Sequence, residues 1–326
     1  MLNIVSGKMK TPVKMTLYGV EGVGKTTFAS KFPRPLFIDA EAGTRRIDVD
    51  RIDVSNWTEC LSVLRQLMNY KNQYDTIVLD TLDALEYLAI QSVCDRFKIP
   101  ALGGNNDYGK SYSALASEFG EMIAELNALN DAGFHIVCLA HAQVVRVETI
   151  GEDGAYDRYQ LKLEKKTSAK IKEWTEFLAF MNFETKVIEQ KGKKNKAVGG
   201  ERIAYCEHSL YWDAKNRDTD SIPLKFSIEM RDGKHIGWET IRKHVEKNTL
   251  NQGKKGESNY DVEEERESVR QLKAVLEAKD MTMDEAMECI YSHKHYVPGT
   301  PLENIDDEYI TGKLIPAIPT LKRKTN

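Results

Sequence analysis

The segment that most constrains this chain is Gly19-Val20-Glu21-Gly22-Val23-Gly24-Lys25-Thr26, which reads G-x-x-x-x-G-K-T. Residues 13–18 before it are rich in β-forming side chains, and residues 27–31 after it form a short segment that can be helical. A glycine loop between a strand and a helix turns backbone N–H groups inward around phosphate oxygens. The segment therefore predicts a phosphate-binding loop; the alternative is a chance glycine-rich turn.

The loop predicts which atoms would hold a nucleotide. Lys25 would reach the β- and γ-phosphates, and the Thr26 hydroxyl would bind Mg²⁺. We therefore expect a nucleoside triphosphate and Mg²⁺ as cofactors. The predicted nucleotide-binding residues are Glu21, Gly22, Val23, Gly24, Lys25, Thr26 and Thr27.

A second apolar segment, residues 74–80, ends on the carboxylate of Asp80. An apolar strand that ends on an acid is common, but downstream of a phosphate-binding loop it predicts the carboxylate side of a magnesium site. We expect Asp80 to hold Mg²⁺ through water, opposite Thr26.

Two more apolar segments lead to polar residues. Residues 36–38 run towards Glu41, and residues 135–140 form a predicted strand with His141 at its tip. Parallel strands of an α/β sheet end at one edge, where ligands bind. We therefore expect Glu41 and His141 to gather beside Gly24 at the carboxyl edge of one sheet.

The alternation of apolar strands with helical segments predicts an α/β fold with a mostly parallel central sheet covered on both faces. Residues 144–165 are polar and predict a long loop or a β-hairpin, and residues 190–200 form a basic, glycine-rich turn between two further strands. The expected helices cover residues 57–68, 82–97, 111–132 and 167–178, and the two further strands cover residues 180–188 and 202–205.

The composition changes near residue 251. We expect a large domain over residues 1–250, a linker over residues 251–259 that is rich in Gly, Asn, Ser and Lys, and a small helical domain over residues 260–326. Its expected helices cover residues 262–279, 283–291 and 305–315.

The overall composition excludes several classes of protein. A net charge of −4 and a pI of about 6.1 argue against coating nucleic acid by bulk charge, although a local basic patch stays possible. No apolar run approaches the roughly 20 residues of a membrane span, and the start lacks a signal-peptide core, so we expect a cytoplasmic protein with no membrane partner. The five cysteines are scattered, which favours reduced thiols over disulfides or a zinc site.

Four segments together resemble RecA-like recombinases in order and spacing: GVEGVGKTT, LFIDAEAG, TIVLDTLDAL and IVCLAHAQ. Within that family the chain is most similar to phage-encoded nucleotide-binding proteins of the Sak type, which act as single-strand annealing proteins. The resemblance covers residues 12–227. It implies a RecA-like P-loop fold, DNA-stimulated Mg²⁺-dependent hydrolysis of ATP, and a homo-oligomer, ring or filament, in a bacterial host cell.

The resemblance implies roles for the polar residues at the strand ends. Glu41 would be the general base that orients the attacking water, while Asp39 or Glu21 are the alternatives. His141 stands where the family has a polar γ-phosphate sensor, and an ordinary strand-end histidine is the other interpretation. A catalytic contribution from Lys25 follows from its contact with the phosphates.

Lys215 and Arg217 resemble the cationic pair of the family that crosses a subunit interface to the γ-phosphate of the neighbour; a basic turn is the alternative. The chain also departs from the family. Arg45 and Arg46 replace an adenine-contacting acid and aromatic, so a preference for ATP rests on the resemblance alone.

Residues 99–110 and 145–166 resemble the two DNA-facing loops of the family. Cations in such loops follow a phosphate backbone, and aromatic side chains stack on unpaired bases. Five acids within residues 148–164 dilute the charge, so a solvated hairpin is the competing interpretation. The predicted DNA-binding residues are Lys110, Arg146, Arg158, Lys162, Lys165 and Lys166.

The sequence therefore predicts an ATP-dependent protein that binds single-stranded DNA and promotes annealing or recombination. A single-strand-binding protein is a further possible partner, through the helical domain. The alternatives are a nucleotide-gated protein-binding switch, a helicase-type ATPase and a P-loop kinase; a clear acceptor site and an arginine-rich lid, which a kinase needs, are not evident.

Overall fold

The computed structural model describes residues 10–148, 154–188, 196–249, 267–279, 281, 283, 286 and 305–318. The chain divides into two compact units, Met1–Lys254 and Lys255–Asn326. The predicted linker and most of the basic turn at residues 190–200 lie outside the described residues. Within the described ranges, none of the helices is both long and apolar enough to cross a membrane.

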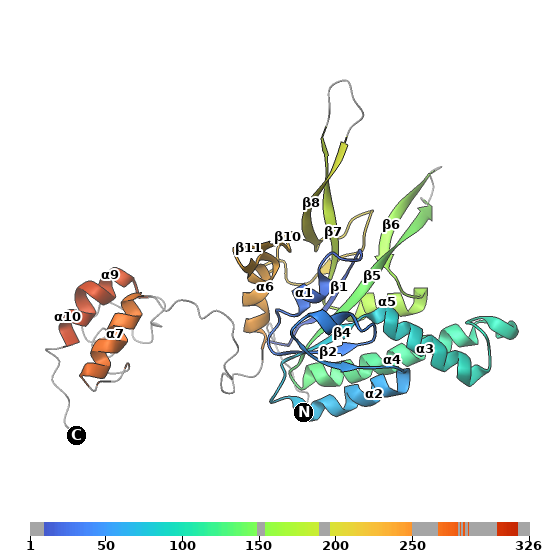
Figure 1. The fold of residues 1–326 in the computed structure, drawn as a ribbon, viewed down its shortest axis with the longest axis horizontal. Coiled ribbons are helices and arrows are strands. Elements are labelled where there is room, and N and C mark those ends of the chain that lie inside the picture. Colours follow the sequence, from blue (N-terminus) through green and yellow to red (C-terminus); the bar gives the residue numbers. More distant parts are fainter. Residues whose placement is uncertain are drawn as a thin grey trace, which may run out of the picture. The chain divides into compact units, whose positions relative to one another are not determined.

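The first unit is built on a ten-stranded sheet (Figure 1). Its centre is parallel, in the order β7–β1–β5–β4–β2–β3. The antiparallel strands β8 and β10 extend the sheet beyond β7, whereas β6 pairs antiparallel with β5 and β9 with β7. This confirms the predicted mostly parallel α/β fold. The central strands are β1 (Lys14–Gly19), β2 (Pro35–Asp39), β3 (Asp50–Asp53), β4 (Thr76–Asp80), β5 (His135–Glu148) and β7 (Phe177–Ile188); the antiparallel ones are β6 (Ala155–Leu161), β8 (Lys196–Tyr205), β9 (Lys215–Asn216) and β10 (Lys225–Ser227).

Helices cover both faces of the sheet. Strand residues alternate between two apolar cores, as Leu17 and Tyr18 do, because successive side chains point to opposite faces. One core contains the apolar residues of the four helices from α2 to α5, and the other those of α1 and α6. The helices are α1 (Lys25–Ala29), α2 (Trp57–Gln66), α3 (Leu82–Phe97), α4 (Lys110–Asp131), α5 (Lys165–Trp174) and α6 (Ile236–Lys247).

Helix starts follow capping chemistry. The Asn56 side chain accepts the N–H of Glu59 at the start of α2, and the Thr81 hydroxyl accepts the N–H of Ala84 at the start of α3. Both caps satisfy backbone donors that a helix leaves unpaired. Helix α3 has the bounds expected from the sequence, whereas α2 ends two residues early and continues as a 3₁₀ turn over Leu67–Tyr70.

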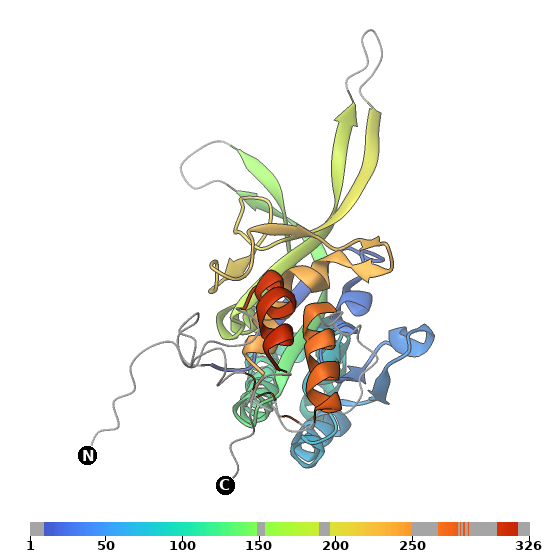
Figure 2. The ribbon, with the colours of Figure 1, turned by 90° about the vertical axis from the view of Figure 1, so that its left-hand side faces the viewer.

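Strand β5 is longer than predicted. It continues beyond Ala140 to Glu148, and from Ala142 onward it pairs antiparallel with β6. The expected loop or hairpin is therefore a hairpin. His141 is not at a strand tip but inside β5, at its last pairing with β1, opposite Gly19. The β5–β6 and β7–β8 hairpins extend as two ribbons away from the helices (Figure 2).

Helix α5 is shorter than predicted. It starts at Lys165 and ends at Trp174, because Phe177 and Leu178 pair with β1 as the first residues of β7. Strand β7 therefore begins three residues before its predicted start. A short apolar segment such as Phe177-Leu178 is compatible with the end of a helix or the start of a strand, so periodicity alone does not distinguish the two.

The second unit has its own apolar core. Helix α7 (Glu267–Ala278) contributes Val269, Leu272 and Leu276, which pack with the segment made of α9 (Asp307–Tyr309), a π-helical turn (Ile310–Leu314) and α10 (Ile315–Ala317). The predicted helices at residues 262–279 and 305–315 overlap these elements. Most of the one at residues 283–291 lies outside the described residues.

Candidate functional site

The glycine loop joins β1 to α1 at the carboxyl edge of the sheet. Gly22 and Gly24 have φ values of 71° and 102°, which side chains with a β-carbon rarely adopt. Lys25 is 6% exposed, and its Nζ donates to the carbonyls of Gly19 at 3.2 Å and Val20 at 3.1 Å. Burial lowers the pKa of Lys25, while nearby carboxylates oppose this shift. The ammonium group is thus held inside the loop that would surround a phosphate.

Asp80 lies next to the loop at the end of β4. Its carboxyl group is buried and hydrogen-bonded to Thr26, while its Oδ2 has no hydrogen-bond partner among the described residues. Burial raises the pKa of Asp80 to about 6, and the negative charges of Asp39 and Glu41 act in the same direction. A buried carboxylate oxygen without a donor, beside a threonine hydroxyl, fits the oxygen-ligand chemistry of Mg²⁺.

Asp39 shapes the loop that presents Glu41. Its carboxylate accepts the N–H groups of Glu41 (3.0 Å), Gly43 (3.3 Å) and Thr44 (3.0 Å), and also the Thr44 hydroxyl at 2.5 Å. Burial works against ionisation of Asp39, but these bonds outweigh it and lower its pKa. Of the three acids considered as the general base, Asp39 is therefore committed to the loop.

Glu41 reaches the magnesium side of the site. Its Oε1 accepts the hydroxyl of Thr81 at 2.6 Å, and Thr81 directly follows Asp80. The Glu41 side chain is 34% exposed, so water has access to it. Three residues far apart in the chain, Lys25, Glu41 and Asp80, therefore meet at one edge of the sheet, close enough for the two carboxylates to act on the pKa of Lys25.

His141 is held by a carboxylate that the sequence reasoning missed. Asp83, in the first turn of α3, accepts the backbone N–H of His141 at 2.9 Å and lies 2.9 Å from its Nδ1. The Asp83 bond raises the pKa of His141, although burial opposes it. Nδ1 also lies 3.7 Å from Oε1 of Glu41. The only signal for Asp83 in the sequence is an acid three residues after Asp80.

These residues form an arrangement suited to phosphoryl transfer to water. The loop and Lys25 can surround phosphates, Thr26 and Asp80 can hold Mg²⁺, and Glu41 can accept a proton from water. Bound Mg²⁺ would supply positive charge that neutralises the phosphate oxygens. His141, fixed by Asp83, lies at the same edge of the sheet and can offer its imidazole to a phosphate oxygen.

Lys215 and Arg217 lie at the opposite edge of the sheet. Asn216, between them, pairs with Phe177 at the start of β7, and Arg217 lines a recess of about 230 Å³ with Lys14 at the start of β1. The loop follows the other end of β1, six residues and about 20 Å away. Neither cation is therefore beside the glycine loop of its own chain.

Lys215 has partners inside its own chain. Its Nζ donates to the carbonyls of Lys172 (3.0 Å), Glu173 (3.0 Å) and Thr175 (2.6 Å), at the end of α5. These three bonds use all the donors of the ammonium group and satisfy carbonyls that a helix end leaves unpaired. Arg217 is exposed, and the structure gives it no ion pair among the described residues.

Two of the predicted DNA-binding arginines differ in their surroundings. Arg158 lies 2.6 Å from Asp213 with its side chain only 12% exposed, so it anchors β6 to the loop before β9. Arg146 is 71% exposed and lies 3.8 Å from Asp157 across the hairpin. Lys162, after β6, is exposed. Of the hairpin cations, Arg146 and Lys162 are therefore the accessible ones.

The other three predicted cations lie at two helix starts. Lys165 and Lys166 begin α5, not a loop as the sequence suggested, and Lys110 begins α4. The Nζ of Lys166 donates to Oγ of Ser113 at 3.0 Å, which brings the two helix starts together. Cations in the first turn of a helix oppose the helix dipole, so these lysines raise the positive potential at this surface.

Helix α3 links the two regions. One turn after Asp83, the buried Glu86 accepts the N–H of Glu164 with both oxygens at 3.0 Å, and it also accepts the Thr167 hydroxyl. Burial raises the pKa of Glu86 to about 7. The same helix therefore holds His141 in β5 and the start of α5.

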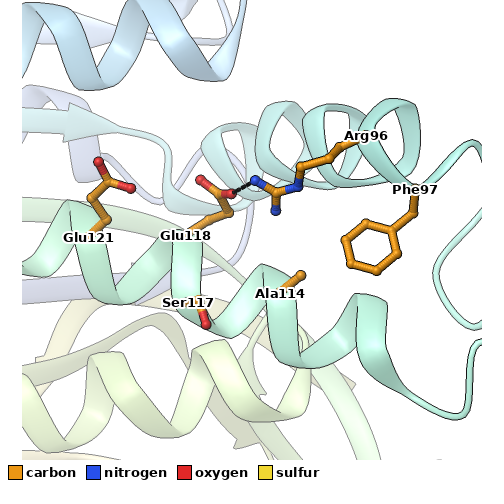
Figure 3. Close-up of a pocket in the computed structure, with 6 residues that line it drawn as sticks. All are labelled: Arg96, Phe97, Ala114, Ser117, Glu118 and Glu121. Carbon is orange, nitrogen blue, oxygen red and sulfur yellow. Dashed lines mark ion pairs between the residues drawn. The ribbon is translucent and has the colours of Figure 1, made fainter.

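A separate hollow of about 500 Å³ lies between α3 and α4 (Figure 3). The ion pair between Arg96 and Glu118, at 2.7 Å, spans it. The ring of Phe97 faces it and is 38% exposed. The hollow contains none of the predicted nucleotide- or DNA-binding residues; its lining is Arg96, Phe97, Ala114, Ser117, Glu118 and Glu121.

Part of this chain is similar in sequence to a known protein. A curated relative, the SPbeta prophage-derived uncharacterized protein YorG of Bacillus subtilis (strain 168), is 29% identical over 133 residues, which are 39% of this chain and 40% of the relative. The chain thus spans less than half the length of that relative.

Similar solved structures include the KaiC-like protein PH0186 of Pyrococcus horikoshii OT3, with 12% identity, a TM-score of 0.41, and coverage of 69% of this chain and 89% of that one. The flagellar accessory protein FlaH of Methanocaldococcus jannaschii has 13% identity, a TM-score of 0.37, and coverage of 70% and 90%.

A family model described as AAA domain (AAA_24) matches residues 11–218, more than half of the chain. The match includes the glycine loop, Glu41, Asp80 and His141. This match shows that the chain belongs to the AAA domain family of P-loop ATPases.

Proposed function

We propose that this protein is a Mg²⁺-dependent ATPase that binds single-stranded DNA and promotes annealing or recombination as a homo-oligomer. The observation that carries the ATPase part is the meeting of Lys25, Thr26, Asp80 and Glu41 at one edge of the sheet. Glu41 orients and deprotonates the attacking water, and Lys25 stabilises the negative charge of the phosphates.

The DNA part is supported by the two adjacent helix starts. Lys110, Lys165 and Lys166 are exposed and come from segments that lie more than fifty residues apart in the chain. Phosphate groups bind well at helix N-termini that also carry cations. The exposed Tyr108 ring, two residues before Lys110, offers a stacking surface for an unpaired base. We therefore place the DNA backbone along the starts of α4 and α5.

Helix α3 supplies a route by which nucleotide and DNA can affect each other. A γ-phosphate that binds His141 pulls on Asp83, and Glu86 on the next turn holds the start of α5. In this proposal, binding of ATP sets the position of Lys165 and Lys166, and hydrolysis releases it. Coupling of this kind requires that both sites bias the same element.

The oligomer is part of the proposal because of Arg217. It lies at the edge of the sheet opposite the glycine loop, so only the Arg217 of another copy can reach a bound nucleotide. A head-to-tail contact of this kind is heterologous and gives rings or filaments. Lys215 is committed to the end of α5, which leaves Arg217 as the candidate for the transition-state contact.

The test is binding of fluorescent single-stranded DNA at several salt concentrations. Replacing Lys165 and Lys166 by alanine should weaken binding and reduce the slope of log K against log salt by about 1.4, which is about 0.7 for each lost phosphate contact. Lys234→Ala changes an exposed lysine on β12 (Lys234–His235) and is the control. Wild-type protein that binds no DNA with ATP, with ADP or without nucleotide would refute the DNA role.

A second candidate, a nucleotide-gated protein-binding switch, is favoured by the hollow between α3 and α4. Its exposed Phe97 ring is an apolar contact of the kind that protein partners bury. If the protein is such a switch, its ATP hydrolysis should be insensitive to DNA. A Phe97→Ser variant should then hydrolyse ATP at the normal rate but fail to bind its protein partner. Strand-separation assays with a forked duplex distinguish annealing from a helicase activity.

A further inference from the structure

An arginine that the sequence reasoning did not select lies against the glycine loop. Arg202, in β8, places its Nη1 3.5 Å from the position that a β-carbon on Gly24 would occupy. Gly24 is the loop residue immediately before Lys25, so the guanidinium group lies beside the backbone that would surround a phosphate.

The strand register explains why Arg202 is at this level. Gly19, the last residue of β1, pairs with Met181 in β7, and Phe183, two residues further along β7, pairs with Arg202 in β8. Two residues of strand extend about 7 Å, so Arg202 lies beyond the end of β1, where the loop begins. Ala204 of β8 belongs to the core shared with Val23 and α1, and the alternation of side chains puts Arg202 on that same face.

Glu229 fixes the direction of the guanidinium group. It accepts Nε of Arg202 at 3.1 Å and Nη2 at 2.7 Å, and it also accepts the backbone N–H of Arg202 at 2.9 Å. Among the described residues, Nη1 has no hydrogen-bond acceptor, and it is the atom nearest Gly24. A paired arginine with its remaining N–H groups turned towards a phosphate-binding loop is a preorganised anion contact.

The position across the sheet indicates which phosphate Arg202 would reach. Glu41 and Asp80, which follow β2 and end β4, lie on one side of β1, so the γ-phosphate must face that side. Strand β8 lies on the other side of β1, beyond β7 (Figure 1). We infer that Nη1 of Arg202 binds the α- and β-phosphates, which ATP and ADP share and which stay on the ADP that hydrolysis releases. This inference rests on the proposed nucleotide binding.

The experiment measures the affinity of the full chain for Mg-ADP and for a non-hydrolysable ATP analogue by calorimetry. Arg202→Gln should weaken the binding of both nucleotides by about tenfold, the equivalent of one charge-assisted hydrogen bond, and Arg202→Lys should lose less. Glu229→Gln is the matched control, because the amide oxygen of glutamine can still accept Nε and the backbone N–H of Arg202 and so keep the guanidinium group oriented, while the competing anion is removed. Its affinity for ADP should stay within about threefold of wild type, or increase.

The outcomes separate the possible roles. Equal losses in Arg202→Gln and Glu229→Gln, with equal drops in thermal midpoint, would mean that the ion pair only stabilises the fold, and would overturn the inference. A loss confined to the ATP analogue would also overturn it, because the contact would then be to the γ-phosphate. Wild-type protein that binds neither nucleotide would refute the proposed function itself, whereas normal binding by Arg202→Gln would refute this inference alone.

Discussion

Replacing Asp83 by asparagine tests the part of the site that the sequence did not reveal. Asp83 holds His141 twice, through the backbone N–H and through Nδ1, both at 2.9 Å. The two side chains are 11% and 19% exposed, so solvent screens their interaction only weakly. Asparagine has nearly the same shape but no charge. It can still accept the backbone N–H, whereas its amide cannot stabilise a protonated imidazole.

The expected loss is that of one charge-assisted hydrogen bond, about 2 kcal/mol in the free energy of unfolding. It depends on pH. His141 has a pKa raised above 6.5, so its contribution is complete below pH 6.5 and disappears as the pH rises through the folded pKa. Asp83 has a pKa lowered below 3.8, so its contribution is complete above pH 3.8 and disappears as the pH falls through the folded pKa. The full difference is therefore expected between pH 3.8 and 6.5.

Urea unfolding of wild type and Asp83→Asn at pH 5.5 and pH 9 measures this difference, and the His141 signal in a proton NMR titration gives its pKa directly. Asp95→Asn, an exposed position on the same helix, should change stability by less than about 0.5 kcal/mol. A loss of equal size at both pH values, or an unchanged pKa for His141, would show that Asp83 does not stabilise a protonated imidazole.

Four further variants test other polar groups. Glu86→Gln should become more stable than wild type as the pH rises from 4.5 through 7, by at most about 3 kcal/mol, because the raised pKa of Glu86 makes ionisation costly in the folded state; unfolding curves at pH 5 and 8 measure this. Asp80→Asn should raise the thermal midpoint at pH 8 by removing a buried charge, yet abolish the Mg²⁺ dependence of nucleotide binding, measured by calorimetry with and without the metal. Lys215→Ala should lower the free energy of unfolding by about 1–2 kcal/mol through the end of α5, whereas Arg217→Ala should leave it unchanged and lower only the ATPase rate at concentrations where copies associate.

The sequence predicted the features that local chemistry determines. The glycine loop and the strand that ends on Asp80 each depend on a few consecutive residues. The meeting of Glu41 with Asp80 was also predictable, because parallel strands end at a common edge. Helix α3 has the bounds expected from the sequence, and in the structure it begins after the Thr81 cap and ends at Lys98, which has a left-handed conformation.

Pairings between distant side chains were not predictable in this way. Arg158 is an exposed DNA contact by its sequence context, but Asp213, 55 residues later, takes its guanidinium group. Likewise, all three N–H donors of the Lys215 ammonium group bond to carbonyls at the end of α5. In both cases the sequence showed the cation, but the group that binds it, and so determines its role, lies in another element.

The same reasoning explains why Asp83 and Glu86 matter together. Positions three residues apart share one face of a helix, so a single element presents one carboxylate to β5 and another to the start of α5. The chain between these two contacts is the β5–β6 hairpin, whose base is therefore tied to α3 on both sides. A change in the charge of His141 is then expected to affect the start of α5 as well as β5, because α3 contacts both. If α3 carries the coupling, Glu86→Gln should alter the effect of ATP on DNA affinity without altering ATP affinity measured in the absence of DNA.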